Sequence, residues 1–160
     1  MPTRWKHRST ARSCENGTVT PTLHLSLPVR DLAESRQFYV DVLGCRPGRE
    51  REGWMDIWFY GMQVTLHERP DQVLTEEKAG VRHFGVALSE EQFDALVVRL
   101  GGHAVEWLRP VSTDHPGTAG QQTKATISDP SGNAIELKWY ADPAIGLEAP
   151  DSQSGRPAAQ

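Results

Sequence analysis

The sequence lacks three features that would assign the chain to other classes of protein. It has two cysteines, Cys14 and Cys45, which are too few for a disulfide framework and lack zinc-binding spacing. No apolar run approaches the roughly 20 residues that span a bilayer, and no apolar segment follows the basic residues near the N-terminus, as a secretory signal requires. The chain has no basic stripe and a net charge of −4, which argues against nucleic-acid binding. We therefore expect a cytoplasmic, reduced protein that binds neither membranes nor nucleic acids.

Both ends of the chain are poor in the residues that build a core. Residues 1–20 are polar and without periodicity, and the chain from Ala141 onward is rich in proline, alanine and serine. Neither segment has enough apolar surface to offset the entropy lost on ordering. The sequence predicts a disordered N-terminal tail over 1–20, one domain over 21–140, and a flexible C-terminal tail over 141–160.

The segment between the tails contains one pattern twice. Its first copy, over 21–70, opens with "LHLSLPV", in which three leucines alternate with other residues as in a half-buried strand. Asp31 and Glu34 form a capping-box pattern before a helix predicted over 31–43. Three strand candidates follow, "RPGRERE", "GWMDIWFY" and "MQVTLHE", of which the first is the weakest.

The second copy, over 80–140, keeps the same order. "VRHFGVAL" predicts a strand, Ser89 and Gln92 form a capping box, and an apolar stripe predicts a helix over 89–100. "HAVEWL", "TKATIS" and "NAIELKWY" supply three more strands, with turn residues in "DPSGN" before the last. The second copy is the longer one, and we place its surplus in a loop, "PVSTDHPGTAGQ"; a loop of this length is commonly a lid.

Strand parity gathers polar and aromatic side chains on the face opposite the core. Side chains alternate across a strand, so the leucines of the first strand, facing the helices, turn its histidine the other way. The same parity applies to the other strands. The residues expected on this second face are His24, Trp54, Asp56, Trp58, Tyr60, Gln63, Thr65, His67, His83 and Glu136.

Two stretches, "HLSLPVRDLAESRQFYVDVLG" and "DPSGNAIELKW", resemble the opening and the close of a vicinal oxygen chelate module. This superfamily includes glyoxalase I, extradiol dioxygenases, fosfomycin-resistance transferases, epimerases and bleomycin-binding proteins. The resemblance covers residues 21–140. It implies an α+β fold in which two βαβββ modules form a cup-shaped mixed sheet, with helices on the convex face and a divalent metal in the concavity.

Matched position by position, the resemblance implies that His24, His83 and Glu136 are the metal ligands. Thr65 stands where glyoxalase I has a fourth ligand, which argues against glyoxalase activity. Gln63 could be a ligand if the register differs by two residues, as in an epimerase. Two histidines and one carboxylate leave about three coordination positions open and favour Fe²⁺ or Mn²⁺, with Zn²⁺ and Ni²⁺ as alternatives.

The reaction we predict is extradiol cleavage of a catechol-like or other vicinal-oxygen substrate. The aromatic side chains on the second face would flank a planar ring, Asp56 could orient a ligand or the substrate, and His67 would be the general base, although it could replace a metal ligand. His115, in the expected loop, could close over the substrate. The alternatives are a glyoxalase-, epimerase- or fosfomycin-transferase-like metalloenzyme, and a metal-free protein that sequesters a drug or metabolite.

The resemblance also implies an assembly. We expect a homodimer, in which the two modules of one chain form a cup together or each pairs with a module of the second chain. Symmetric dimers are the commonest oligomers.

Overall fold

The computed structural model describes residues 22–74 and 81–147. The predicted tail over 1–20 lies outside the described residues, as do residues 148–160 of the C-terminal segment. Within the described part of the chain, no helix is long and apolar enough to cross a membrane.

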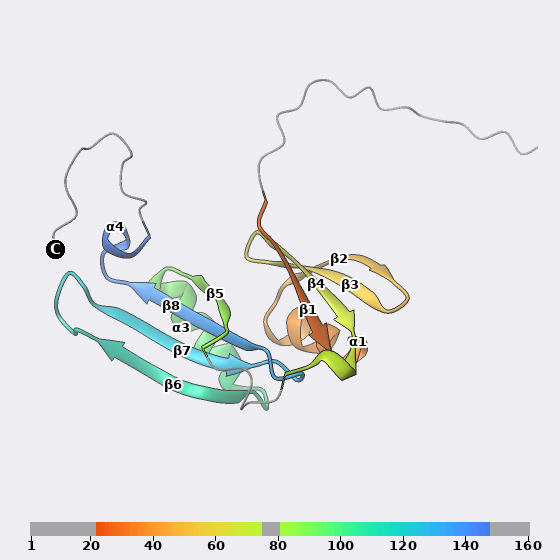
Figure 1. Cartoon of the computed structure of the whole chain (residues 1–160). Helices are drawn as coiled ribbons and strands as arrows, with labels where there is room; N and C mark the ends of the chain where they lie inside the picture. The colour runs from red at the N-terminus through yellow and green to blue at the C-terminus, as the bar shows by residue number, and fades with distance from the viewer. Residues whose placement is uncertain (1–21, 75–80, 148–160) are drawn as a thin grey trace, which may run out of the picture.

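Module one contains the predicted strand, helix and three strands in that order (Figure 1). Its sheet has the strand order β1-β4-β3-β2, in which β1 and β4 are parallel and the remaining neighbours antiparallel. The elements are β1 (His24–Val29), α1 (Leu32–Arg36), a π-helical segment η1 (Gln37–Val42), β2 (Arg46–Arg51), β3 (Trp54–Phe59), β4 (Met62–Glu68) and a 3-10 turn η2 (Pro70–Gln72).

Module two repeats this arrangement with the strand order β5-β8-β7-β6, and β5 and β8 are its parallel pair. The predicted fold class, two βαβββ modules, is therefore confirmed; in one chain the two sheets stay separate. The elements are β5 (Phe84–Ala87), α3 (Glu90–Gly101), β6 (Glu106–Asp114), β7 (Gln122–Ser128), β8 (Ala134–Tyr140) and α4 (Pro143–Gly146).

Local sequence signals account for the helix starts. The Asp31 carboxylate accepts a hydrogen bond from the backbone N–H of Glu34 at 2.7 Å, which satisfies one of the free N–H groups of the first turn. Ser89 and Gln92 form both bonds of a capping box at α3. The first helix differs from the prediction in its second half, where the Leu43 N–H bonds to the carbonyl of Phe38, five residues back.

Strand parity predicted the inward faces well. Met55, Ile57 and Phe59 in β3 are buried, and so are Val64 and Leu66 in β4. They belong to one core shared by both modules.

Leu23 is an exception to the predicted parity. It precedes β1 and is 76% exposed, so only the two later leucines of "LHLSLPV" pack against the core. The strand begins one residue later than the alternation suggested, and the alternating pattern alone did not show where pairing with β4 starts.

Two predicted segments differ from the structure. "PVSTDHPGTAGQ" is not one long loop, because β6 extends to Asp114 and β7 begins at Gln122. The surplus residues instead lengthen the β6–β7 hairpin, in which Thr113 pairs with Thr123 and Asp114 with Gln122. In the predicted C-terminal tail, Pro143–Gly146 forms a short helix that Asp142 caps.

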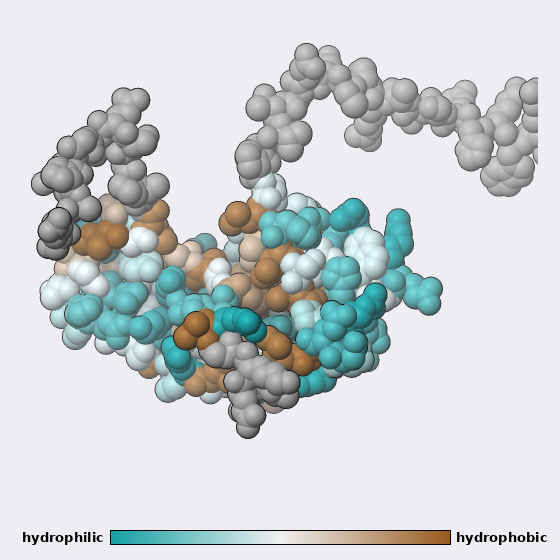
Figure 2. All heavy atoms as spheres, in the orientation of Figure 1, coloured by the Kyte–Doolittle hydropathy of each residue, from teal (hydrophilic) through white to brown (hydrophobic). Residues whose placement is uncertain are grey.

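Hydrogen bonds join the first strand and helix of module one, and the connection between them, to the β7–β8 turn of module two. The buried Tyr39 hydroxyl donates to the Asp129 carboxylate at 2.9 Å. The backbone N–H of Arg30 donates to the Ser131 hydroxyl at 2.9 Å, and the Asn133 side chain donates to the Pro28 carbonyl at 3.2 Å. The modules lie side by side, and the surface in view is hollowed between two raised ends, with hydrophobic residues gathered in the hollow (Figure 2).

Candidate functional site

The structure brings two of the three predicted metal ligands together. His83 immediately precedes β5, and Glu136 lies in β8, which runs parallel to β5 with Gly85 opposite Glu136. His83 Nε2 is 3.5 Å from Glu136 Oε2. The glutamate side chain is mostly buried, at 15% exposed, whereas the histidine is 44% exposed. Glu136 is therefore largely shielded from solvent, whereas His83 is accessible to it.

The second ring nitrogen of His83 is held by the backbone. Nδ1 lies 2.9 Å from the carbonyl oxygen of Val81, which can only accept a hydrogen bond, so the ring proton is assigned to Nδ1. Nε2 of the neutral ring then points its lone pair toward a carboxylate oxygen. A proton or a metal ion between these two atoms would join them, and the ammonium of Lys138 already lies beside the other carboxylate oxygen. Metal-bound histidines are usually oriented through their other nitrogen in this way, and the donor pair fits a divalent metal.

Gly85 allows the parallel strand to approach Glu136 closely. A Cβ atom at Gly85 would lie 2.0 Å from the backbone oxygen of Glu136, far inside van der Waals contact. Any other residue there would displace β8 at the position that carries the candidate ligand. The glycine therefore has a steric role beside the site.

Glu136 also contacts a cationic side chain. Lys138 Nζ lies 3.0 Å from Glu136 Oε1, and this hydrogen bond, opposed by partial burial, raises the pKa of Lys138 above its usual value. The two carboxylate oxygens thus have different neighbours, His83 at Oε2 and Lys138 at Oε1. The lysine was not anticipated from the sequence, although its position two residues after Glu136 on one strand places it on the same face.

His24 lies in the other sheet. It is exposed at the start of β1 and pairs in register with Gln63 of β4. Across residues 22–74 and 81–147, no group of three or more histidine, cysteine, aspartate and glutamate side chains could hold a metal ion. The three-ligand assignment therefore stays a prediction, and within one chain the structure groups only His83 with Glu136.

In module one, Asp56 is a hydrogen-bonding centre on the face opposite the core. Its carboxylate accepts from Thr65 Oγ1 at 2.7 Å, from Arg49 Nε at 2.7 Å and from Gln63 Nε2 at 3.3 Å. Burial opposes ionisation, but the bonds from Thr65 and Arg49, the charge of Arg49 and the bond from Gln63 outweigh it and lower the pKa of Asp56. Thr65 and Gln63, two predicted site residues, therefore donate hydrogen bonds to the Asp56 carboxylate.

Two arginines cover the aromatic residues of this face. Arg46 lies over the ring of Trp58 and Arg49 over that of Trp54, each 5.4 Å from the ring centroid. The sequence did not predict that both arginines lie on this face. Arg46 and Arg49 are three residues apart, and in a regular strand residues at that spacing point to opposite sides of the sheet. A register shift between Pro47 and Glu50 changes the parity, as a bulge does. Only the three-dimensional pairing reveals it.

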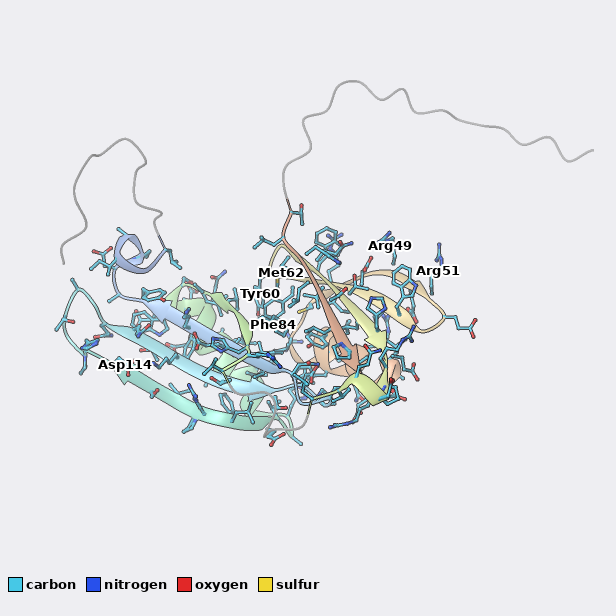
Figure 3. The ribbon with its side chains drawn as sticks, viewed as in Figure 1. Arg49, Arg51, Tyr60, Met62, Phe84 and Asp114 are labelled. Atoms are coloured by element: carbon cyan, nitrogen blue, oxygen red, sulfur yellow. The ribbon has the colours of Figure 1, made fainter. Side chains whose placement is uncertain are left out.

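The remaining predicted site residues occupy different places. Tyr60 is not in a strand wall: with Gly61 it forms the β3–β4 turn, both at positive φ (45° and 93°), as the commonest two-residue hairpin loop requires. Figure 3 shows Tyr60 near Met62 and Phe84, between the modules. His67 pairs with Trp54 in register, and His115 is exposed in the β6–β7 turn.

A cavity of about 830 Å³ lies beside His83. It is lined by both modules, including Arg109 and Thr126 of module two and Glu34 and Phe38 of module one. This volume is within the range of small-molecule pockets. His83, which immediately precedes β5, thus lies at the wall of a space large enough for a small molecule.

Known proteins with similar sequences and folds agree with this architecture. The chain is 28% identical over 124 residues to a catechol-2,3-dioxygenase of Bacillus subtilis (strain 168), covering 74% of this chain and only 40% of that protein. A glyoxalase/bleomycin resistance protein/dioxygenase from Alicyclobacillus acidocaldarius is 29% identical, with a TM-score of 0.71 over 79% of this chain and 96% of the other.

A genomically encoded fosfomycin resistance protein from Listeria monocytogenes shares the fold at 16% identity, with a TM-score of 0.63 over 76% of this chain and 94% of that one. The model of the Glyoxalase/Bleomycin resistance protein/Dioxygenase superfamily matches residues 22–137, which include both modules and the His83–Glu136 pair. The chain belongs to this superfamily.

Proposed function

We propose that the chain is a metal-dependent enzyme that binds a small molecule through two adjacent oxygens and cleaves it with dioxygen, as an extradiol dioxygenase does. One observation carries the proposal: His83 Nε2 and Glu136 Oε2 lie 3.5 Å apart, with the other nitrogen of His83 anchored to the Val81 carbonyl. The relationship to a catechol-2,3-dioxygenase supports the choice of reaction.

A bound Fe²⁺ or Mn²⁺ would supply the Lewis acidity that holds two substrate oxygens and the redox chemistry that dioxygen cleavage requires. The chain's own residues do the rest. Glu136 and His83 provide a carboxylate oxygen and an imidazole nitrogen, and Val81 fixes the orientation of the imidazole. Trp54 and Trp58 each have an arginine over one face of the ring and would present the other face to a planar substrate. His67, which is directly opposite Trp54 on the neighbouring strand, accepts a proton from the substrate.

His24 enters this site from a second copy of the chain, and Trp54, Trp58 and His67 come with it because they lie in the same sheet. In one chain it lies in a different sheet from His83 and Glu136, and a two-fold axis would place module one of each copy against module two of the other. Such a homodimer has two equivalent sites, each built from both chains.

Subunit mixing tests the shared site. His24→Ala and Glu136→Gln homodimers are each expected to lose metal. When they are mixed, unfolded and refolded together, a shared site would be intact in one half of every heterodimer and restore roughly a quarter of the wild-type metal content. No recovery, with heterodimers shown by mass spectrometry, would refute the shared site. A monomer in light scattering would refute it as well.

The reaction is tested separately. Protein loaded anaerobically with Fe²⁺ or Mn²⁺ is expected to consume oxygen with catechols, and His83→Ala is expected to lose this activity together with the metal. Thiol consumption with an epoxide or a glyoxal, without oxygen uptake, would replace the dioxygenase by a transferase or glyoxalase. Tight ligand binding without turnover under any metal would identify a sequestering protein.

A further inference from the structure

Two lysines, Lys124 and Lys138, lie side by side on neighbouring strands, two residues along the sheet from Glu136 and on the same face. Lys138 in β8 is directly opposite Lys124 in β7, and both are on the face that carries Glu136. They are the only lysines among the residues that the structure describes. Their side chains are 31% and 33% exposed, so both are partly withdrawn from water. Like charges placed directly opposite destabilise a sheet, and this arrangement therefore needs negative charge nearby.

Among the residues that the structure describes, each of these lysines is paired with one carboxylate. Lys138 pairs with Glu136 at 3.0 Å, and Lys124 pairs with Asp114 at 2.5 Å. Glu136 is the carboxylate we assign to the metal. A divalent cation at His83 and Glu136 would take over that carboxylate and add two positive charges to a face that already holds Lys124, Lys138 and, in the row of Glu136, Arg109.

We propose that this face binds an anionic group of the substrate, a carboxylate or a phosphonate, through Lys138 and Lys124, beside the site that takes the two adjacent oxygens. This inference rests on the proposed function and names the substrate class: a vicinal-oxygen compound that also carries an acidic group. An ammonium group has three donor hydrogens, so the pairs with Glu136 and Asp114 do not exhaust either lysine. Ser112, opposite Lys124 in β6, adds a hydroxyl to the same row.

The spacing fits a ring-sized substrate. The backbone positions of Glu136 and Lys138 are about 6.8 Å apart along the strand, and the Lys138 ammonium, now 3.0 Å from Glu136 Oε1, would have to turn away from it to contact an anion at that distance. This spacing is close to the length of an aromatic ring with one substituent, so a dihydroxybenzoate could place its hydroxyls at the metal and its carboxylate at the lysines. Asp114, at the end of β6 (Figure 3), is paired with Lys124, so the substrate anion would share this lysine with it.

Binding to the metal-loaded 160-residue chain tests the inference. With Mn²⁺ bound, we expect 3,4-dihydroxybenzoate to bind about tenfold more tightly than catechol, measured by tryptophan fluorescence. Lys138→Met and Lys124→Met should each reduce this preference at least about threefold, and the double variant should abolish it. Arg36→Met is the matched control, because it removes a cation from helix α1 that is paired loosely with Glu50 at 3.9 Å; the preference should persist. Equal binding of acid and catechol by wild type, or a preference that survives in the double variant, would overturn the inference.

A second measurement separates this inference from the metal site. Benzoate, phenylphosphonate and benzyl alcohol lack adjacent oxygens, and we expect the two anions, but not the alcohol, to shift the ¹³C-lysine NMR signals of Lys124 and Lys138 selectively. The stronger of the two anions identifies the acidic group. If catechol binds but neither anion shifts these signals, the lysine site is wrong and the proposed function stands. If the anions shift them but no catechol binds the metal-loaded protein, the anion site stands and the vicinal-oxygen function is wrong. Equal shifts of all lysine signals, or none with any probe, would refute the anion site.

Discussion

Tyr39→Phe removes one buried hydroxyl from the contact between the modules and leaves the ring in place. Tyr39 is fully buried, and its hydroxyl donates to Asp129 Oδ2 at 2.9 Å. Burial and then the charge of Asp129 raise the pKa of Tyr39 well above its usual value, so the hydroxyl remains a donor. Asp129 also accepts hydrogen bonds from the backbone N–H groups of Ser131 and Asn133 and from the Asn133 side chain.

The expected loss follows from the bond type. A hydrogen bond to a charged group contributes about 1.5–3 kcal/mol, and for a domain of this size each kcal/mol lowers Tm by about 2–4 °C. Tyr39→Phe should therefore lower Tm by about 3–12 °C at pH 7.

The loss should also depend on pH. Burial raises the pKa of Asp129 above its ordinary value, and hydrogen bonds from Asn133, Tyr39 and Ser131 oppose this rise. Because the folded pKa is higher than the unfolded one, about 3.9, the contribution of this carboxyl to stability falls as the pH rises between these two values. Without the Tyr39 hydroxyl the folded pKa rises further and the fall continues to higher pH. The difference between the variant and wild type should therefore be smaller near pH 3.5 than at pH 7.

Thermal unfolding at each pH, followed by tryptophan fluorescence, measures the change in Tm, and urea denaturation at the same pH values gives the corresponding change in the free energy of unfolding. Tyr60→Phe is the matched control, since Tyr60 is 46% exposed, and we expect it to change stability by less than about 0.5 kcal/mol. A Tyr39→Phe variant as stable as the control, or a loss that is equal at the two pH values, would refute the role assigned to the Tyr39–Asp129 bond.

Two further predictions concern the faces that carry the site. Gly85→Ala places a Cβ against the Glu136 backbone. It should lower the free energy of unfolding by about 1–3 kcal/mol and weaken metal binding measured by calorimetry. Gly101→Ala is the control and should do neither, because its Cβ would meet no atom within 4 Å. Asp56→Asn should destabilise by about 1–3 kcal/mol at pH 7; because the folded pKa of Asp56 is lowered, the difference from wild type should shrink as the pH falls below about 4, and a difference that grows in acid would contradict this account.

The parts of the site that the sequence predicts are those fixed by alternation along one strand. Glu136 follows from its two apolar neighbours in "AIEL", and His83 from the parity of "HFGVAL", and these two do meet. The position of His24 relative to them depends on how the two sheets are arranged, which no local pattern specifies. Arg49 illustrates a second limit, because a bulge in β2 reversed its expected side.

The two modules contain the same pair of residue types at equivalent places, with the strands exchanged. In module two the carboxylate is on the last strand, Glu136, opposite Thr126; in module one the threonine is on the last strand, Thr65, opposite Asp56. This exchange changes the chemistry. Asp56 is 1% exposed and its oxygens are occupied by Thr65, Arg49 and Gln63.

A carboxylate held in this way has no oxygen directed at a histidine, whereas Glu136 has one directed at His83. On the proposed ligand set, module one would therefore contribute an imidazole, from His24, and Asp56 would not be a ligand. The expected stoichiometry follows from this asymmetry: one metal ion for each pair of modules, with three protein ligands and without the fourth that a glyoxalase would require. Metal analysis of the purified wild-type protein should give about one ion per chain, and two ions per chain would show that Asp56 is released from its partners to bind the second.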